Sequence, residues 1–544
     1  MELVASCLWE SWIFLLLCGP LLAFGFYCAY VHVVHLRYDH IPGPPRASFL
    51  FGHLSYITRQ KWDNGKILQD VFLEWAKEYG PIVRINVFHR ASVILTSPES
   101  VKVFLMNPEY KKDPLIYSKI QNLYGERFLG RSLVSELDHE LWRKQRRILD
   151  LAFHRSYLMS LMGTINEKVE QMMAILEAKA DGQTEVCMQN VICSTIYDLS
   201  AKILFGMESN SSVDGQNPFL LEIQSIMEGM ALMNNPFSRF SPGKRKLINK
   251  TRESIRCLRQ MGKEWIQYRR EAFQNNQEFP PDVIMQLLKG AAEEDRNDEF
   301  LVDNFVTFLI AGSETSCNQV LLTLMELQRH PKIVERLRAE VDEVIGTKKN
   351  IEYRDLGKLQ YLSQVLKEVL RLYPPVTGTV RWLEKDTVVD GFLIPGCTSL
   401  FFSTYVMGRL EIYFEDPLTF NPERFSPEVF KPNFTYFPFS LGPRSCIGQY
   451  LSQVLPTTSL PTTTPEDLQR NLFTKVLGIV KRFEFQTLDL IPVGPESFSH
   501  DNLGTRIASK VQQTQHGNPK KSECLGVKSK AGFRLGIVLM ICGN

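Results

Sequence analysis

A helical segment in the middle of the chain does most to limit the folds that are open to it. Residues 299–330, EFLVDNFVTFLIAGSETSCNQVLLTLMELQRH, follow a helical pattern and are apolar on most faces. A helix that is apolar nearly all round belongs inside a protein core. Pro331 follows and supplies a stop, because proline lacks the amide hydrogen that a further turn needs. We therefore expect a large protein packed around this helix.

The remaining pattern predicts mixed α and β structure that is mostly helix. The chain has 544 residues, which suggests one large domain or two fused ones. Two short β-branched stretches, 81–88 and 91–97, predict strands. Helical periodicity predominates afterwards, for example in residues 167–180, 253–273 and 332–346.

Composition and charge exclude several classes of protein. Hydrophobic residues make up 44% and charged residues 22% of the chain, as in a folded rather than a disordered protein. Lys and Arg number 62 against 60 Asp and Glu, so the basic excess typical of nucleic-acid binding is missing. No two of the eleven cysteines have the two-residue gap of a zinc or redox motif. We expect free thiols in a reducing compartment.

The N-terminus predicts a membrane anchor. Residues 11–36 contain no Asp, Glu, Lys or Arg and are long and apolar enough to cross a bilayer. The basic flank at Arg37 should stay cytosolic, which places the N-terminus in the lumen. The alternative is a cleaved signal peptide, but the run is long for one and lacks a small-residue cleavage site. We predict residues 1–36 as lumenal N-terminus and transmembrane helix, and residues 37–50 as a stiff proline-rich hinge.

The loop FSLGPRSCIG at 439–448 carries the strongest chemical signal. A lone cysteine before a helix is far more often a structural thiol than a ligand. Here Gly442 and Gly448 permit tight turns and close approach to a flat cofactor. A helix starting after Cys446 would favour a thiolate through its dipole. Arg444 places a fixed cation two residues away, suited to a carboxylate of the cofactor.

This loop resembles the haem-binding loop of the cytochrome P450 superfamily. In that family the cysteine is the axial thiolate ligand of the haem iron. The resemblance implies that Cys446 binds the metal and that haem b is the cofactor. It also implies an α+β, mainly α-helical fold, with a helical domain and a small β-rich N-terminal region. The matching fixed positions are Phe439, Gly442, Arg444, Cys446 and Gly448.

The segment WRKQR at 142–146 matches a second motif of that family. Trp142 and Arg146 share one helix face. By itself the segment reads as a basic surface helix. The resemblance implies that both side chains hold a haem propionate. It also places Arg143, Lys144 and Arg147 on the surface where an acidic redox partner docks.

The segment AGSETS at 311–316 resembles the family's oxygen-activation motif. Gly, Ser, Thr and Glu are unfavourable inside an apolar helix, so a packing notch or an exposed face is the simpler explanation. The functional interpretation is a local helix distortion on the oxygen-binding side of the haem. An acid followed by a hydroxyl can deliver protons there through water. Glu314 and Thr315 are therefore the predicted catalytic residues.

Two further segments complete the resemblance. Glu368 and Arg371, an i, i+3 pair, resemble with Arg424 the family's Glu-Arg-Arg cluster, a structural element. An i, i+3 pair of this kind is otherwise common on helix surfaces. Arg381 resembles the arginine that pairs with the second propionate. This combination in the family's order indicates a thiolate-haem monooxygenase domain over residues 51–490.

Longer stretches resemble the cholesterol 24-hydroxylases of that superfamily, over about residues 37–455. They include HIPGPPRASFLFGHL, DNFVTFLIAGSETSCN and LQYLSQVLKEVLRLYPP. The resemblance implies hydroxylation of the cholesterol side chain with oxygen and electrons from NADPH through a cytochrome reductase. It implies an endoplasmic reticulum membrane location with a cytosolic catalytic domain. An apolar-basic stretch that could touch lipid, or be an ordinary loop, contains Phe237, Phe240 and 244–246.

The C-terminal part departs from the family pattern. Pro456, Pro461 and Pro465 interrupt the helix that should follow the cysteine loop, so residues 455–471 read as an atypical insertion. Residues 491–544 read as a divergent, disordered tail. Two alternatives stay open: a non-catalytic or poorly active variant, and a thiolate-haem isomerase or dehydratase that needs no external electrons. The Glu314–Thr315 pair argues against the isomerase, since proton delivery to oxygen serves a monooxygenase.

Overall fold

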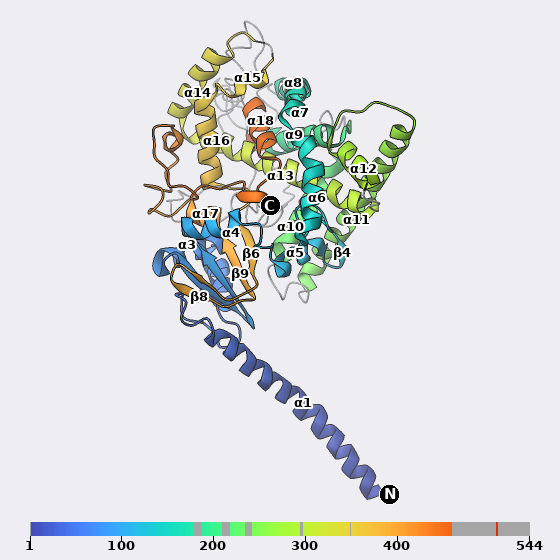
Figure 1. Ribbon diagram of the computed structural model, residues 1–544, viewed down its shortest axis with the longest axis vertical. Coiled ribbons are helices and arrows are strands. Elements are labelled where there is room, and N and C mark those ends of the chain that lie inside the picture. The colour runs from blue at the N-terminus through green and yellow to red at the C-terminus, as the bar shows by residue number, and fades with distance from the viewer. Residues whose placement is uncertain are drawn as a thin grey trace, which may run out of the picture.

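The computed structural model describes residues 2–178, 186–208, 218–233, 242–293, 298–348, 350–459 and 508–509. Most of these residues are helical, and a long N-terminal helix projects away from the rest (Figure 1). Three short 3-10 helices are η1 (Leu151–Phe153), η3 (Pro422–Phe425) and η4 (Gly442–Arg444). The α-helices are α1 (Glu2–Leu36), α2 (Leu54–Asn64), α3 (Leu68–Tyr79), α4 (Pro98–Met106), α5 (Pro114–Gln121), α6 (His139–Asp150), α7 (Arg155–Ser160), α8 (Met162–Ala178), α9 (Met188–Phe205), α10 (Pro218–Met233), α11 (Pro242–Gln274), α12 (Val283–Glu293), α13 (Asp298–Arg329), α14 (Pro331–Val344), α15 (Tyr353–Leu356), α16 (Gln360–Leu372), α17 (Thr404–Met407) and α18 (Gln449–Ser459).

The main sheet has four strands in the order β1-β2-β9-β6. β1 (Ile82–Val87) and β2 (Arg90–Leu95) form an antiparallel hairpin, β9 (Thr398–Phe402) pairs parallel to β2, and β6 (Thr379–Leu383) pairs antiparallel to β9. The sheet lies between α1 and the helical part of the molecule (Figure 1). The shorter strands are β3 (Asn122–Leu123), β4 (Glu126–Arg127), β5 (Val186–Cys187), β7 (Thr387–Val389), β8 (Phe392–Ile394) and β10 (Ala508–Ser509).

The predicted elements agree with the structure, apart from the origin of the sheet. The central helix is α13, which ends at Arg329 one residue before His330, and Pro331 opens α14. Both predicted strands are present as β1 and β2. The small β-rich N-terminal region is present as β1 and β2, and the other two strands of the sheet come from residues 379–402. A parallel partner for β2 needs a distant segment, and sequence periodicity does not identify which one.

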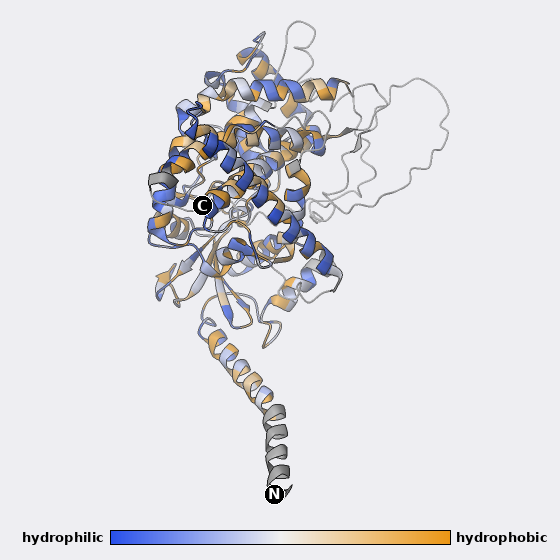
Figure 2. Cartoon of the chain, turned by 90° about the vertical axis from the view of Figure 1, so that its right-hand side faces the viewer, coloured by the Kyte–Doolittle hydropathy of each residue, from blue (hydrophilic) through white to orange (hydrophobic). Residues whose placement is uncertain are grey.

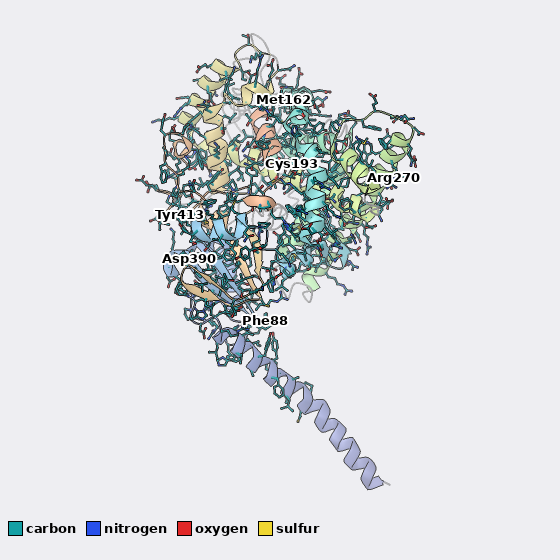
Figure 3. All side chains as sticks on the ribbon, viewed as in Figure 1. Phe88, Met162, Cys193, Arg270, Asp390 and Tyr413 are labelled. Atoms are coloured by element: carbon teal, nitrogen blue, oxygen red, sulfur yellow. A yellow bond between two sulfur atoms is a disulfide. The ribbon has the colours of Figure 1, made fainter. Side chains whose placement is uncertain are left out.

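Helix α1 contains a segment, Cys18–Leu36, that is long and apolar enough to cross a membrane. In Figure 2 the coloured part of α1, in which orange hydrophobic residues alternate with paler and blue ones, extends away from the domain. The end of α1 is packed against the sheet, where Val31 and His35 are buried. The His35 ring makes a 2.7 Å hydrogen bond with the Phe88 carbonyl in the β1–β2 turn, and Figure 3 labels Phe88 at this junction. The helix is therefore attached directly to the domain.

The predicted hinge is held in place by β1. The Arg84 amide donates to the Pro42 carbonyl at 2.9 Å, and the Arg84 guanidinium donates to the Ile41 carbonyl at 2.6 Å. His53 bonds to the Pro44 carbonyl at 3.0 Å. The proline-rich segment is thus anchored at several points rather than only stiffened by its prolines.

The cysteines differ from the expectation in one place. Cys193 of α9 and Cys317 of α13 form a disulfide. Six of the remaining cysteines that the structure describes are outside any disulfide. Proximity across a helix pair brings the two sulfurs together, and their separation of 124 residues gave no sequence signal.

Helix α18 passes through Pro456 instead of ending there. It continues to Ser459, three residues beyond the proline. The Thr457 and Thr458 hydroxyls donate to the carbonyls of Gln453 and Val454 at 2.6 and 2.9 Å. These side-chain bonds supply local hydrogen bonding in a turn that lacks one amide donor. The expected insertion beyond residue 459 and the tail 491–544 lie outside the described residues, apart from the two-residue strand β10.

Candidate active site

A mainly apolar cavity of about 870 Å³, including its part open to solvent, lies between α13 and the loop before α18. Cys446, Phe439 and Gly448 line it from that loop. Ala311, Gly312, Thr315, Ser316 and Gln319 line it from α13. These α13 positions recur at helical spacing, so a single face of the core helix forms one wall. Other apolar lining residues are Leu133, Val134, Phe153, Leu204, Phe308, Leu370 and Val376.

The cysteine loop presents Cys446 to this cavity. The Cys446 amide donates to the Phe439 carbonyl at 2.9 Å, which closes the loop. Helix α18 begins at Gln449, three residues after the cysteine. The predicted helix is therefore present, and its N-terminal end lies near the sulfur, where its dipole stabilises a thiolate.

The two glycines of the loop, Gly442 and Gly448, lie close to different parts of the structure. Gly442 has a φ of +72°, and a Cβ there would lie 2.2 Å from the Leu105 carbonyl oxygen. This φ agrees with the expected tight turn, and the close approach is to the backbone at the end of α4; the role of Gly442 at the cofactor stays a prediction. Gly448 lines the cavity, and a Cβ there would lie 3.9 Å from the Cys446 sulfur.

Buried cations gather beside the cysteine loop. Arg444 stacks on Trp142 of α6, with its guanidinium carbon 4.0 Å from the ring centre. Burial, helped by the charge of Arg381, lowers the pKa of Arg444 to about 9. Burial also lowers the pKa of Arg381 on β6. Two buried arginines that destabilise each other's charge form a site that carboxylates would stabilise.

Lys112 and Tyr117 extend this group, and the sequence analysis missed both. Lys112 is buried, donates to the Val134 carbonyl, and lies 4.5 Å from the centre of the Tyr117 ring. Tyr117 is buried too, and its hydroxyl lies 3.5 Å from the Thr379 hydroxyl. A lysine in the sequence KKDP gives no signal that it will be buried; the contact of the loop before α5 with β6 decides it.

Arg146 contacts the cysteine loop itself. Its guanidinium donates to the Ser445 carbonyl at 2.7 Å and to Asp150 at 2.8 Å. It thus braces the residue next to Cys446, and its role at a propionate stays a prediction. Arg143, Lys144 and Arg147 on the same helix are exposed, as expected of a docking surface. Of the proposed lipid-contact stretch, 244–246 is exposed, while Phe237 and Phe240 lie outside the described residues.

Helix α13 is continuous through 311–316, and the local distortion expected there stays a prediction. The Thr315 hydroxyl donates to the Ala311 carbonyl at 2.7 Å, and the Ser316 hydroxyl donates to the Gly312 carbonyl at 2.8 Å. Such back-bonds satisfy polar side chains without breaking the helix. Thr315 faces the cavity. Glu314 does not line it and instead bonds to Tyr197 of α9.

A cavity-lining hydroxyl was also missed. Thr307 lies two helical turns before Thr315 on the same face of α13 and lines the cavity. It is buried, and its hydroxyl has no hydrogen-bond partner among the described residues. It adds another polar group to the α13 wall beside Thr315, Ser316 and Gln319.

The predicted Glu-Arg-Arg cluster is assembled away from the cavity. Glu368 and Arg371 of α16 are fully buried and pair at 2.7 Å. Arg424 of η3 lies 3.4 Å from the Glu368 carboxylate. Arg371 also donates to the Gly408 and Pro417 carbonyls at 2.6 and 2.7 Å. The cluster ties α16 to the segment that leads into the cysteine loop.

Comparison with known proteins agrees with this geometry. The family model for cytochrome P450 matches residues 42–460. Cytochrome P450 4d2 of Drosophila melanogaster is 28% identical, over 87% of this chain and 92% of its own. Cytochrome P450 72A68 of Medicago truncatula is 30% identical, over 66% of this chain and 70% of its own. Protein LUTEIN DEFICIENT 5, chloroplastic, of Arabidopsis thaliana is 28% identical, over 79% of this chain and 77% of its own.

The site is that of a thiolate-haem monooxygenase. The chain belongs to the cytochrome P450 family. This family uses haem b and electrons that come from NADPH through a reductase. The residues fit that group, because an apolar cavity with a cysteine sulfur in its wall adjoins buried arginines.

Proposed function

We propose that this chain is a sterol monooxygenase that hydroxylates the cholesterol side chain. One observation carries the chemistry: Cys446 and Thr315, from separate elements, line the same apolar cavity. The haem, when bound there, supplies oxygen activation. The protein supplies the thiolate, a hydroxyl at the cavity wall and an environment that excludes water.

The other site residues take supporting roles. Arg444 and Arg381, with Trp142 stacked on Arg444, would hold the haem carboxylates and be neutralised by them. Arg146 positions the cysteine loop through the Ser445 carbonyl. Glu314 and Thr315 deliver protons to the cavity side of α13.

The sterol assignment is supported by chemistry and by resemblance. The cavity lining is dominated by aliphatic and aromatic side chains, which suit a lipid substrate. The apolar α1 would keep the domain at a membrane, where such a substrate dissolves. The stretches that resemble the cholesterol 24-hydroxylases include α16 and the long α13. With these we propose a single-pass anchor in the endoplasmic reticulum membrane and a cytosolic catalytic domain that docks the reductase.

The test uses the full chain in a membrane. Carbon monoxide added to the reduced protein should give the red-shifted absorption of a thiolate ligand, and Cys446→Ala should abolish it. Cys257→Ala, an exposed free cysteine on α11, is the matched control and should leave it intact. A histidine-type band, or no haem retention, would refute the thiolate site and favour a non-catalytic chain.

Turnover then tests the substrate. Cholesterol, NADPH and reductase should yield side-chain-hydroxylated sterol. A thiolate spectrum with no such product would refute the sterol assignment alone. Conversion of a substrate without NADPH would support the isomerase alternative.

A further inference from the structure

The contact between α9 and α13 places a second layer of groups behind the cavity wall. Gly312 allows the two helices to approach, since a Cβ there would meet the Leu204 side chain of α9 at 3.0 Å. Cys193 and Cys317 join the same helices covalently. Figure 3 labels Cys193 within the helical part of the molecule. The spacing of α9 and α13 is thus held at two points on either side of Glu314.

Tyr197 and Glu314 meet at this contact. The Tyr197 hydroxyl donates to a Glu314 carboxylate oxygen. The other oxygen accepts a weak 3.5 Å contact from the Asn318 amide. Tyr197 is completely buried and lies one helical turn after Cys193 on α9. Glu314 is therefore held on the α9 side of the helix, while its neighbour Thr315 faces the cavity.

We infer that Tyr197 is a positioning residue for Glu314: it holds the acid in reserve, behind the cavity wall, as the proton source for Thr315. This inference rests on the proposed function. Glu314 has no role in the cavity while it is bonded to Tyr197, so delivery of a proton requires that this bond open. The tyrosine hydroxyl gives the acid a defined resting position one residue from the hydroxyl that it serves.

The electrostatic environment of Glu314 favours the protonated form of its carboxyl group. Burial raises the pKa of Glu314, and the hydrogen bonds from Tyr197 and Asn318 lower it by less. Among the described residues, these are the groups that act on the Glu314 carboxyl. No charged side chain of the neighbouring α11, α12, α16 or α18 contributes. Loss of the Tyr197 hydroxyl should therefore raise the pKa of Glu314 further.

An infrared comparison tests the pair without turnover. The wild-type spectrum should contain a protonated-carboxyl band that is lost in Glu314→Gln. Tyr197→Phe should shift this band to higher frequency, because the carboxyl loses its donor. The chain offers a matched control: Tyr373 donates at 2.9 Å to Glu326, also on α13 and buried, but outside the cavity wall. Tyr373→Phe should leave the Glu314 band where it is.

A second readout is independent of whether Glu314→Gln folds. In wild type the pH profile of product formation should have an alkaline limb from Glu314, and Tyr197→Phe should move this limb to higher pH. Tyr197→Phe should also lower the fraction of NADPH electrons that appear in product. Tyr373→Phe should change neither quantity.

The outcomes separate the two claims. An unshifted carboxyl band and an unmoved limb in Tyr197→Phe would overturn the positioning role and leave the monooxygenase intact. A missing thiolate spectrum would overturn the proposed function, while the infrared band would still decide whether Tyr197 holds a protonated Glu314.

Discussion

His53 should make the stability of this protein sensitive to mild acid. The ring is buried beside the hinge. The backbone amide of Asn86 donates to Nδ1 of His53 at 3.0 Å, and Nε2 bonds to the Pro44 carbonyl at 3.0 Å. Nδ1 must therefore accept and Nε2 must carry the hydrogen, which is the arrangement of a neutral imidazole. A second proton would have to sit on Nδ1, facing the Asn86 amide.

The size of the effect follows from the pKa. Burial is the main cause that lowers the pKa of His53 from 6.5 to about 4. Between these values the unfolded chain binds a proton that the folded chain does not, so stability falls as the pH falls. For this pair of values the loss is about 2 kcal/mol between pH 7 and pH 5 and reaches about 3 kcal/mol at pH 4. Below pH 4 the contribution of His53 levels off.

Urea unfolding at a series of pH values measures this loss. His53→Gln should lower stability at pH 7, because two buried hydrogen bonds are disturbed, but it should reduce the additional loss at pH 5 by about 2 kcal/mol. The difference between the two proteins cancels the contribution of the other titrating groups. His154→Gln replaces an exposed imidazole and is the matched control. Parallel losses in wild type and His53→Gln would refute the argument.

Two other predictions concern the support of the site. Arg371→Ala should lower the free energy of unfolding by about 3–5 kcal/mol, because it leaves the buried Glu368 without its closest partner. Arg336→Ala, at the exposed pair with Glu423, is the control and should lower it by at most about 1 kcal/mol. Equal shifts of the urea midpoint in the two variants would contradict this prediction. Gly442→Ala should reduce haem retention, since φ is +72° and the Leu105 carbonyl lies 2.2 Å from the new Cβ. Gly243→Ala, with open space around it, is its control, and full retention of haem in Gly442→Ala would count against the close approach.

Local signals in the sequence were enough for the helices and for the cysteine loop. The periodicity of residues 299–330 predicted α13 to within a residue at each end, since a helix that is apolar all round has few alternatives. Glycine and arginine around Cys446 identified the loop because each supplies a backbone or charge property that other residues lack. The family resemblance implied that Glu368, Arg371 and Arg424 form one cluster, and the structure places them together.

Local signals could not predict the residues whose burial or contacts depend on segments far apart in the chain. Lys112, Tyr117 and Thr307 have no local pattern that marks them as buried at a site. Arg146 contacts the Ser445 carbonyl and Gly442 contacts the end of α4; no motif predicts these two contacts, and the roles of both residues at the cofactor stay predictions. For both Arg146 and Gly442 the contact is with backbone atoms, whose position depends on the packing of other elements.

The amino-acid order alone specified the cysteine loop, the core helix and the apolar N-terminal segment, because each depends on residues that are near one another in the chain. The family followed from several such motifs in a fixed order. Tertiary packing decided which side chains face the cavity. Neighbouring residues on a helix point about 100° apart, so Thr315 lines the cavity while Glu314 is turned toward Tyr197. That division depends on where α9 lies, and no local pattern contains it.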